Sequence, residues 1–214
     1  MRLGKEAMEA LKAEITGELK AGDSLVVAGA VALEGTKRLA KIEYEELRAY
    51  FSEGFLKEAS RVQELYGVGE DAAGSESWKL AEQAGANALY ACGSGGILTA
   101  LWKMAEAAEV GLTIDLRKIP IRQETIELFE RYDLNPYKIL SQGAILIGIS
   151  GGEGLVQELK NKGIPAAVIG QATDGNDRLL YSGENVRYLE RPVKDEMEKR
   201  KWRRANGEIE HCTS

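Results

Sequence analysis

The residues best suited to chemistry in this chain form one glycine-rich stretch. Residues 90–108 read YACGSGGILTALWKMAEAA, so an apolar run ends at Gly93-Ser94-Gly95-Gly96 and a helical pattern begins at once. Backbone N–H groups at the start of a helix carry a partial positive charge that favours an anion, and glycines let a phosphate approach the backbone closely. Gly93, Ser94, Gly95 and Gly96 are therefore a candidate phosphate-facing turn.

This turn matches neither of the common nucleotide-binding motifs. A dinucleotide motif that begins at Gly93 needs a glycine where Leu98 stands, and a P-loop needs a lysine followed by Ser or Thr. A second pair, Gly151-Gly152, fails both patterns too. Tight β–α turns with close helix–sheet packing explain both pairs, and on the residues alone this is the favoured interpretation. We expect the two turns to lie at the same edge of the sheet, where ligands bind in open α/β sheets.

Nucleophiles and metal ligands are few. The chain has two cysteines, Cys92 and Cys212, and one histidine, His211. Cys92 adjoins the turn, and a buried core thiol is favoured over a nucleophile because no histidine lies near it in the sequence. Two of these three residues stand in the last four positions, so we expect no metal site, and the catalytic residues are unknown. Two cysteines are too few for a disulfide framework in a chain of this size, and this favours a protein of the reducing cytoplasm.

The charge pattern limits the partners. The net charge of −6 argues against a general nucleic-acid binder. The segment KRKWRR at 199–204 follows Asp195, Glu196 and Glu198, so a C-terminal helix with mixed faces is favoured over a tail that contacts phosphate or RNA. No stretch has the length of a membrane span, and the charged N-terminus lacks an apolar signal core. We expect a cytoplasmic protein with no membrane partner.

The elements that position the turn follow from hydrophobic periodicity. Met8, Leu11, Ile15 and Leu19 are spaced three or four positions apart and form the apolar stripe of one N-terminal helix. The pattern then predicts strands over 24–28, 87–92, 111–116, 143–150 and 166–171, helices over 35–50, 53–66, 77–84, 95–108, 124–132 and 153–162, and a hairpin of residues 178–181 and 186–189.

This order predicts an α+β fold with a mixed β-sheet and packed helices. Strand, glycine pair, helix and strand recur twice, around Gly95-Gly96 and around Gly151-Gly152. Two tandem β-α-β units indicate a partial ferredoxin-like topology. The right-handed crossover rule then places both helices on one face of the sheet.

Several segments together resemble the C-terminal domain of the AIR synthase superfamily. The main match is GANALYACGSGGILTALWKMAEAAEVGLTIDLRKIPIRQET, and DLNPYKILSQGAILIGIS, GIPAAVIGQAT and VRYLERPVKDE follow it in the family's order. AGDSLVVAGAVALEGTKRLA resembles the strand and helix that open that domain. The resemblance covers roughly residues 20–196 and points to the branch of hydrogenase maturation factors and AIR synthase-related proteins.

The resemblance implies that this chain lacks residues with which its relatives bind ATP and Mg. Relatives carry an N-terminal domain that holds Mg and ATP and forms the dimer, and here only about twenty residues precede the C-terminal domain. Relatives usually have His-Asp before the glycine-rich turn, where this chain has Tyr90-Ala91, and Ile-Gly-Glu where it has Ile169-Gly170-Gln171. Hydrogenase maturation factors use a C-terminal cysteine as a carrier. Cys212 is not terminal and lacks the family's lead-in, so we interpret it as a coincidence.

These features predict a stand-alone C-terminal-type domain that is not catalytic alone and acts as an assembly or regulatory module. The alternative is a subunit of an ATP-dependent enzyme whose ATP-binding half comes from another protein, so that ATP and Mg bind only with that partner. We expect a homodimer, because the face that the N-terminal domain covers in relatives is open here. The expected parts are an N-terminal helix (1–20), the domain (21–196) and a basic tail (197–214).

Overall fold

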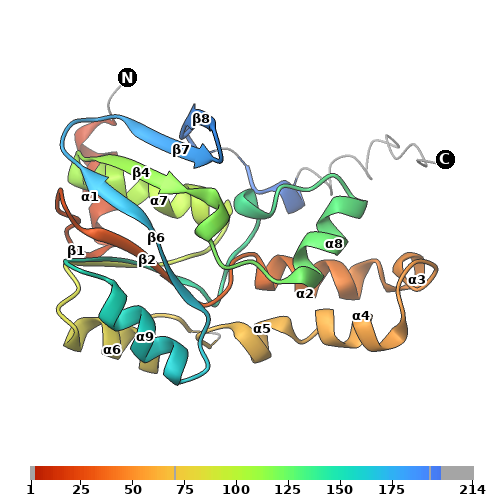
Figure 1. Cartoon of the computed structure of the whole chain (residues 1–214). Coiled ribbons are helices and arrows are strands. Elements are labelled where there is room, and N and C mark those ends of the chain that lie inside the picture. Colours follow the sequence, from red (N-terminus) through yellow and green to blue (C-terminus); the bar gives the residue numbers. More distant parts are fainter. Residues whose placement is uncertain (1–2, 70, 193, 199–214) are drawn as a thin grey trace.

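The computed structural model of the chain describes residues 3–69, 71–192 and 194–198. These residues form one mixed sheet with strand order β1-β3-β5-β2-β6-β4-β7-β8, covered by helices (Figure 1). The strands are β1 (Thr16–Gly17), β2 (Ser24–Ala28), β3 (Ala88–Ala91), β4 (Gly111–Asp115), β5 (Ile145–Ile149), β6 (Ala166–Thr173), β7 (Arg178–Ser182) and β8 (Asn185–Tyr188). The helices are α1 (Lys5–Ala13), α2 (Leu33–Ile42), α3 (Tyr44–Leu47), α4 (Glu53–Ala59), α5 (Val62–Tyr66), α6 (Glu76–Gln83), α7 (Gly96–Ala108), α8 (Gln123–Arg131) and α9 (Glu153–Asn161).

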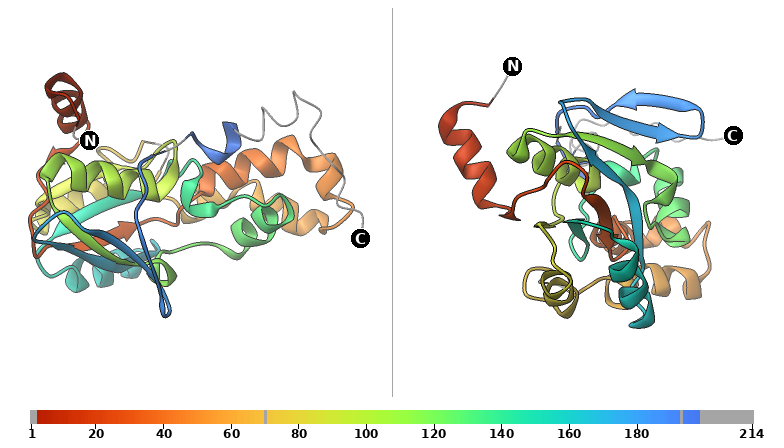
Figure 2. Two further views of the ribbon diagram at one scale, coloured as in Figure 1. Left: turned by 90° about the horizontal axis from the view of Figure 1, so that it is seen from above. Right: turned by 60° about the vertical axis from the view of Figure 1, so that its left-hand side comes forward.

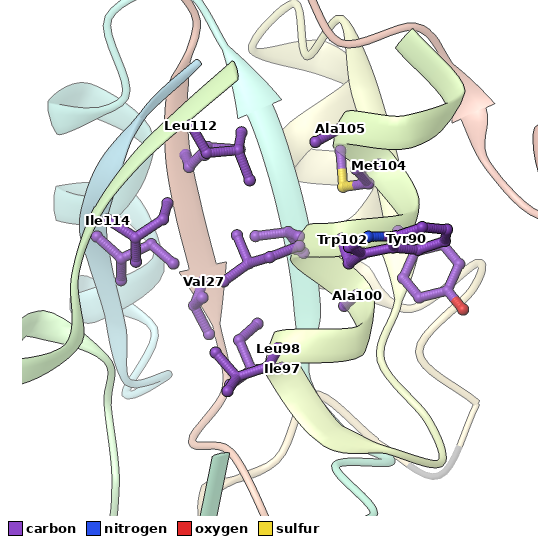
Figure 3. Packing of buried hydrophobic residues seen from close by; sticks show 14 of the residues in the cluster. Val27, Tyr90, Ile97, Leu98, Ala100, Trp102, Met104, Ala105, Leu112 and Ile114 are labelled. Atoms are coloured by element: carbon purple, nitrogen blue, oxygen red, sulfur yellow. The ribbon is translucent and has the colours of Figure 1, made fainter. Parts of the chain in front are cut away.

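The central strands of the sheet are buried on both faces. Successive side chains of a strand point to opposite faces, and in β2 Val27 belongs to one hydrophobic cluster and Val26 to another. The Val27 cluster includes α7, as Figure 3 shows, and the Val26 cluster includes α6 and α9. The β-branched run of β2 therefore forms a central strand, and the predicted fold class is confirmed.

The helices of the two β-α-β units lie on opposite faces of the sheet, so the expectation of one shared face was wrong. β3 and β5 run antiparallel, with Ala91 opposite Ile145, so the chain enters the two units in opposite directions. The crossovers from β3 to β4 and from β5 to β6 both move toward the β8 end of the sheet. Because β3 and β5 point in opposite directions, two right-handed crossovers must place α7 and α9 on opposite faces of the sheet. For the same reason Gly95-Gly96 and Gly151-Gly152 lie at opposite ends of the sheet and not at one edge.

A helical arm of α2, α3, α4, α5 and α8 extends beyond one end of the sheet (Figure 1). The single helix predicted over 35–50 divides into α2 and α3 because the buried Glu43 leaves the helical backbone region, with φ −100° and ψ 16°. The helix predicted over 53–66 divides into α4 and α5. Ser52 caps α4 as its type predicts, since its Oγ accepts the Phe55 N–H at 3.2 Å.

The residues of the predicted stripe pack on their own chain, but the helix expected over 1–20 was too long. α1 ends at Ala13, so only Met8 and Leu11 of the stripe lie on it, and Ile15 and Leu19 lie on either side of β1. Leu11 and Leu19 are buried in the cluster around α7, and Met8 and Ile15 pack against it. The rest of α1 stands away from the body (Figure 2). The chain then forms β1, which pairs with β3 and which hydrophobic periodicity does not predict, since two residues are too few to show a pattern.

The predicted hairpin is confirmed as β7 and β8. β7 lies parallel to β4, and β8 is the last strand of the sheet in the described chain, with all four residues exposed. Residues 190–192 and 194–198, called the strap below, follow β8 and return to the start of α7.

Candidate functional site

The glycine-rich turn joins the end of β3 to the start of α7 and is tight. Gly95 and Gly96 have φ of +76° and +68°, the left-handed region that favours glycine. A Cβ on Gly96 would lie 2.5 Å from the Tyr137 carbonyl oxygen and 2.7 Å from that of Ile139. The Gly93 carbonyl accepts the N–H groups of Gly96 and Ser141. Close packing of backbone against backbone therefore requires the second glycine.

The turn also binds the side-chain carboxylate of Asp195 from its own chain. The Gly95 N–H donates to Asp195 Oδ2 at 2.7 Å, and Ser94 Oγ lies 3.5 Å from the same oxygen. Asp195 is 4% exposed and follows Gly95 by 100 residues. A carboxylate here faces the positive end of α7. Sequence reasoning missed Asp195, which stood in a short acidic run without any spacing that related it to the turn.

A narrow cleft with cationic walls adjoins the turn. Its volume is about 30 Å³, space for little more than a water molecule. Its lining includes Gly95, Leu98 and Thr99, the cationic side chains of Lys138 and Arg187, and residues 190–192 of the strap. Lys138 pairs with Glu190 of the strap at 3.1 Å. The cleft therefore suits a small anionic group by charge.

Tyr90, near the end of β3, anchors the N-terminal segment. It is 8% exposed, its hydroxyl donates to Glu14 Oε2 at 3.2 Å, and burial raises its pKa. Glu14 also pairs with Lys103 of α7. Burial acts to lower the pKa of Lys103, but Glu14 and Tyr90 together raise it. Figure 3 shows Tyr90 at the edge of the cluster, away from Val27. These contacts hold the end of α1 against β3 and α7.

Cys92 is a core thiol. It is 4% exposed, and burial raises its pKa to about 12. A thiol with such a pKa is almost wholly protonated near pH 7, and the thiolate is the nucleophile. Cys92 therefore does not act as a nucleophile in this fold.

The other positions noted in the sequence lie away from the turn. Gln171 is exposed and donates to the Gly22 carbonyl, and it pairs with Ser24 at the opposite end of β2 from the turn. At that same end, a Cβ on Gly152 would lie 2.5 Å from Val26 Cγ2, so close packing explains this glycine. His211, Cys212 and the basic segment 199–204 lie outside the described residues. Within the described ranges no three Cys, His, Asp or Glu residues are grouped to hold a metal ion.

The sequence was compared with models of known families. Residues 20–181 match the model of the AIR synthase related protein, C-terminal domain. The chain belongs to this family. No curated protein sequence matches the chain.

Solved structures of similar fold include other members of the AIR synthase related group. E. coli HypE, a hydrogenase maturation protein, has a TM-score of 0.63 and 20% identity over 84% of this chain and 52% of that one. HypE in a HypE–HypF complex has a TM-score of 0.60 and 17% identity over 82% and 54%. Thiamine-monophosphate kinase from Stenotrophomonas maltophilia K279a has a TM-score of 0.57 and 18% identity over 77% and 51%. The chain thus spans about half the length of these proteins, and at these identities the likeness shows the fold. In the described part of this AIR synthase related chain no helix is long and apolar enough to cross a membrane.

Proposed function

We propose that this AIR synthase related chain performs no catalysis alone and acts as an assembly or regulatory module. The observation that carries the proposal is the buried Asp195 carboxylate, which accepts the Gly95 N–H at the one anion-facing turn of the candidate site. Tyr90 and Cys92, the polar residues that precede the turn, are engaged in packing. With Asp195 in place and a cleft of about 30 Å³, these residues do not fit ATP with Mg.

The proposed module is a homodimer that works in the cytoplasm. Its core is residues 21–196, with residues 1–20 as an appendage and 197–214 as a tail. Exposed apolar side chains that support self-association include Val186 and Tyr188 on β8 and Ile42 at the end of α2. Closed two-fold dimers are the commonest oligomers of soluble proteins.

A second candidate is a subunit that completes an ATP-dependent enzyme together with another protein. The cationic cleft beside the Gly93–Gly96 turn favours it, since Lys138 and Arg187 suit a phosphate group. One structural neighbour, HypE, is known in complex with another protein, HypF. In this alternative the partner supplies the residues that hold Mg and ATP, and the turn contributes backbone N–H groups.

Titration of ATP and Mg into the purified chain, followed by calorimetry and by phosphate release, tests whether the chain is inactive alone. We expect neither binding at micromolar concentration nor hydrolysis. A melting curve of the same sample shows that the protein is folded. Stoichiometric binding by the chain alone would overturn the proposed function.

A further inference from the structure

The helical arm carries an open groove that the candidate site does not use. α2 and α4 lie side by side in the arm and are joined through α3 (Figure 1). The groove between α2–α3 and α4 has a volume of about 690 Å³, within the range of pockets that hold a ligand. Its apolar lining consists of Ala40, Ile42, Tyr44 and Leu56. Ile42 is 55% exposed, so the described part of the chain leaves apolar surface of the groove uncovered.

The charged residues of the groove are ordered along it. Glu45 and Glu53 line the groove and flank the connection from α3 to α4. Lys41 and Lys57 also line it, and each lies four positions further from that connection, which is about 6 Å along a helix. Glu45 pairs with Arg48, but both side chains are exposed and such pairs contribute little. The groove therefore has an acidic end near the connection and a basic end one helical turn away.

The last described residues of the chain lie against this arm. Met197 of the strap packs against the buried cluster of the arm, which includes Ala40 and Leu56 of the groove. Residues 199–214, called the terminal segment below, therefore follow a residue that contacts the same cluster as the groove. At about 3.3 Å per residue the terminal segment can extend by ~50 Å, whereas α2 is about 15 Å long. Its length is thus sufficient to cross the groove.

The terminal segment has a composition that complements the groove. Its first part, KRKWRR, combines five basic residues with Trp202, and Glu208 and Glu210 follow. Its order of charge, basic and then acidic, matches the acidic and basic ends of the groove. A tryptophan buries a large apolar area and commonly anchors a contact of this kind. A segment of the same chain also acts at a higher effective concentration than a separate molecule, which favours it over a second copy.

We propose that the terminal segment folds back onto the helical arm, with Trp202 in the groove, residues 199–204 at its acidic end, and Glu208 and Glu210 toward its basic end. Such docking covers the exposed side chain of Ile42 and pairs the charges at both ends. A partner of the arm must then compete with the chain's own terminus for this groove. The inference does not rest on the proposed function, since it concerns the arm and not the Gly93–Gly96 turn.

The test is acrylamide quenching of tryptophan fluorescence in the full-length chain. Trp78 and Trp102 are 8% and 9% exposed, so an undocked Trp202 would be the tryptophan that acrylamide reaches best. We expect little quenching in the wild type. Ile42→Arg places a positive charge in the groove against the basic run, and it should raise the quenching constant severalfold and shift the emission to longer wavelength. The addition of Trp202→Phe to that variant should abolish both changes.

Leu65→Arg is the matched control, since Leu65 is 45% exposed on α5 of the same arm but does not line the groove. Its fluorescence should be quenched like that of the wild type. Ile42→Arg changes an exposed residue and should fold, which a melting curve checks. Trp202→Ala is a second variant that leaves every described residue unchanged. It should shift the amide resonances of residues 40–45 and 53–60, and those of α9 should stay the same.

Three results would overturn the inference. The first is a wild-type Trp202 that acrylamide quenches as readily as free tryptophan. The second is a shielded Trp202 that Ile42→Arg does not release, because the indole would then dock elsewhere. The third is shielding that is lost on dilution, because the groove would then hold the terminal segment of a second copy.

Discussion

Gly96 is the residue of the turn that tolerates the least change. We expect Gly96→Ala to lower the free energy of unfolding by about 1–3 kcal/mol through left-handed backbone strain, and further through its contacts with the Tyr137 and Ile139 carbonyls. Gly93→Ala is the matched control, because Gly93 has open space around it and no positive φ. Urea denaturation of both variants measures the difference. Equal stability would show that the turn is looser than these contacts indicate.

Cys92 should be inert in the folded protein. With a pKa of about 12, roughly one thiol in 10⁴ is ionised at pH 8, so alkylation of Cys92 in a Cys212→Ser background should proceed only through unfolding. Mass spectrometry with and without urea measures this. Rapid alkylation in the folded state would contradict the assignment of Cys92 to the core.

The same thiol should make stability depend on pH. The ordinary pKa of 9.0 applies in the unfolded chain and about 12 in the folded one, so between these values the folded state holds more protons. The free energy of unfolding therefore falls as pH rises above about 9, by up to ~1.4 kcal/mol per pH unit from this group. Cys92→Ala should lose this part of the slope, and identical slopes in denaturation series at pH 9–10 would contradict it.

At the scale of elements, α1 is joined to the body at few points. Leu11 is buried, whereas Lys5, Glu6 and Glu9 are exposed. We expect Leu11→Ala to release α1 from α7 and to increase amide exchange over residues 5–13 by on the order of tenfold or more, because the loss of a buried leucine side chain costs about 2–5 kcal/mol. Exchange in α9 should stay unchanged.

Glu9→Ala is the control for that variant, since Glu9 lies on the exposed side of the same helix. If Leu11→Ala leaves exchange in α1 unchanged, contacts other than the apolar stripe hold this helix. The ion pair of Glu14 with Lys103 and the hydroxyl of Tyr90 are then the next contacts to remove.

At the scale of the whole molecule, the open edge of the sheet is the expected dimer contact. Val186 and Tyr188 on β8 are 53% and 66% exposed, and in the described chain β8 pairs with β7 alone. Antiparallel pairing of two β8 edges across a two-fold axis would satisfy their backbone groups and cover these side chains. Light scattering should then give a mass near twice 23.4 kDa.

Val186→Lys should convert this dimer to a monomer, because two charges would meet at the new strand pair. Ile126→Lys is the control, since Ile126 is 48% exposed but lies on α8 in the helical arm. A wild-type mass near 23.4 kDa at tens of micromolar would refute the dimer. If Ile126→Lys abolishes the dimer and Val186→Lys does not, the dimer contact lies on the helical arm instead.

The sequence by itself determined most of the elements, the fold class and the turn, but not β1, the end of α1 at Ala13 or the division of two predicted helices. The run of β2, the stripe of α1 and the glycines before α7 each leave a local pattern, because a strand repeats every two residues and a helix every 3.6. Glycine at a strand end marks a turn for the same local reason. These features need only neighbours in the chain, and so the alternating strands and helices were predictable.

Only the tertiary structure decided what meets at the turn and on which face each helix lies. Asp195 and Gly95 are 100 residues apart, and no spacing relates them. The antiparallel pairing of β3 with β5 sends α7 and α9 to opposite faces, although both units have the same local pattern. Periodicity reports which side of an element is buried, whereas strand direction and distant contacts depend on how the whole chain packs.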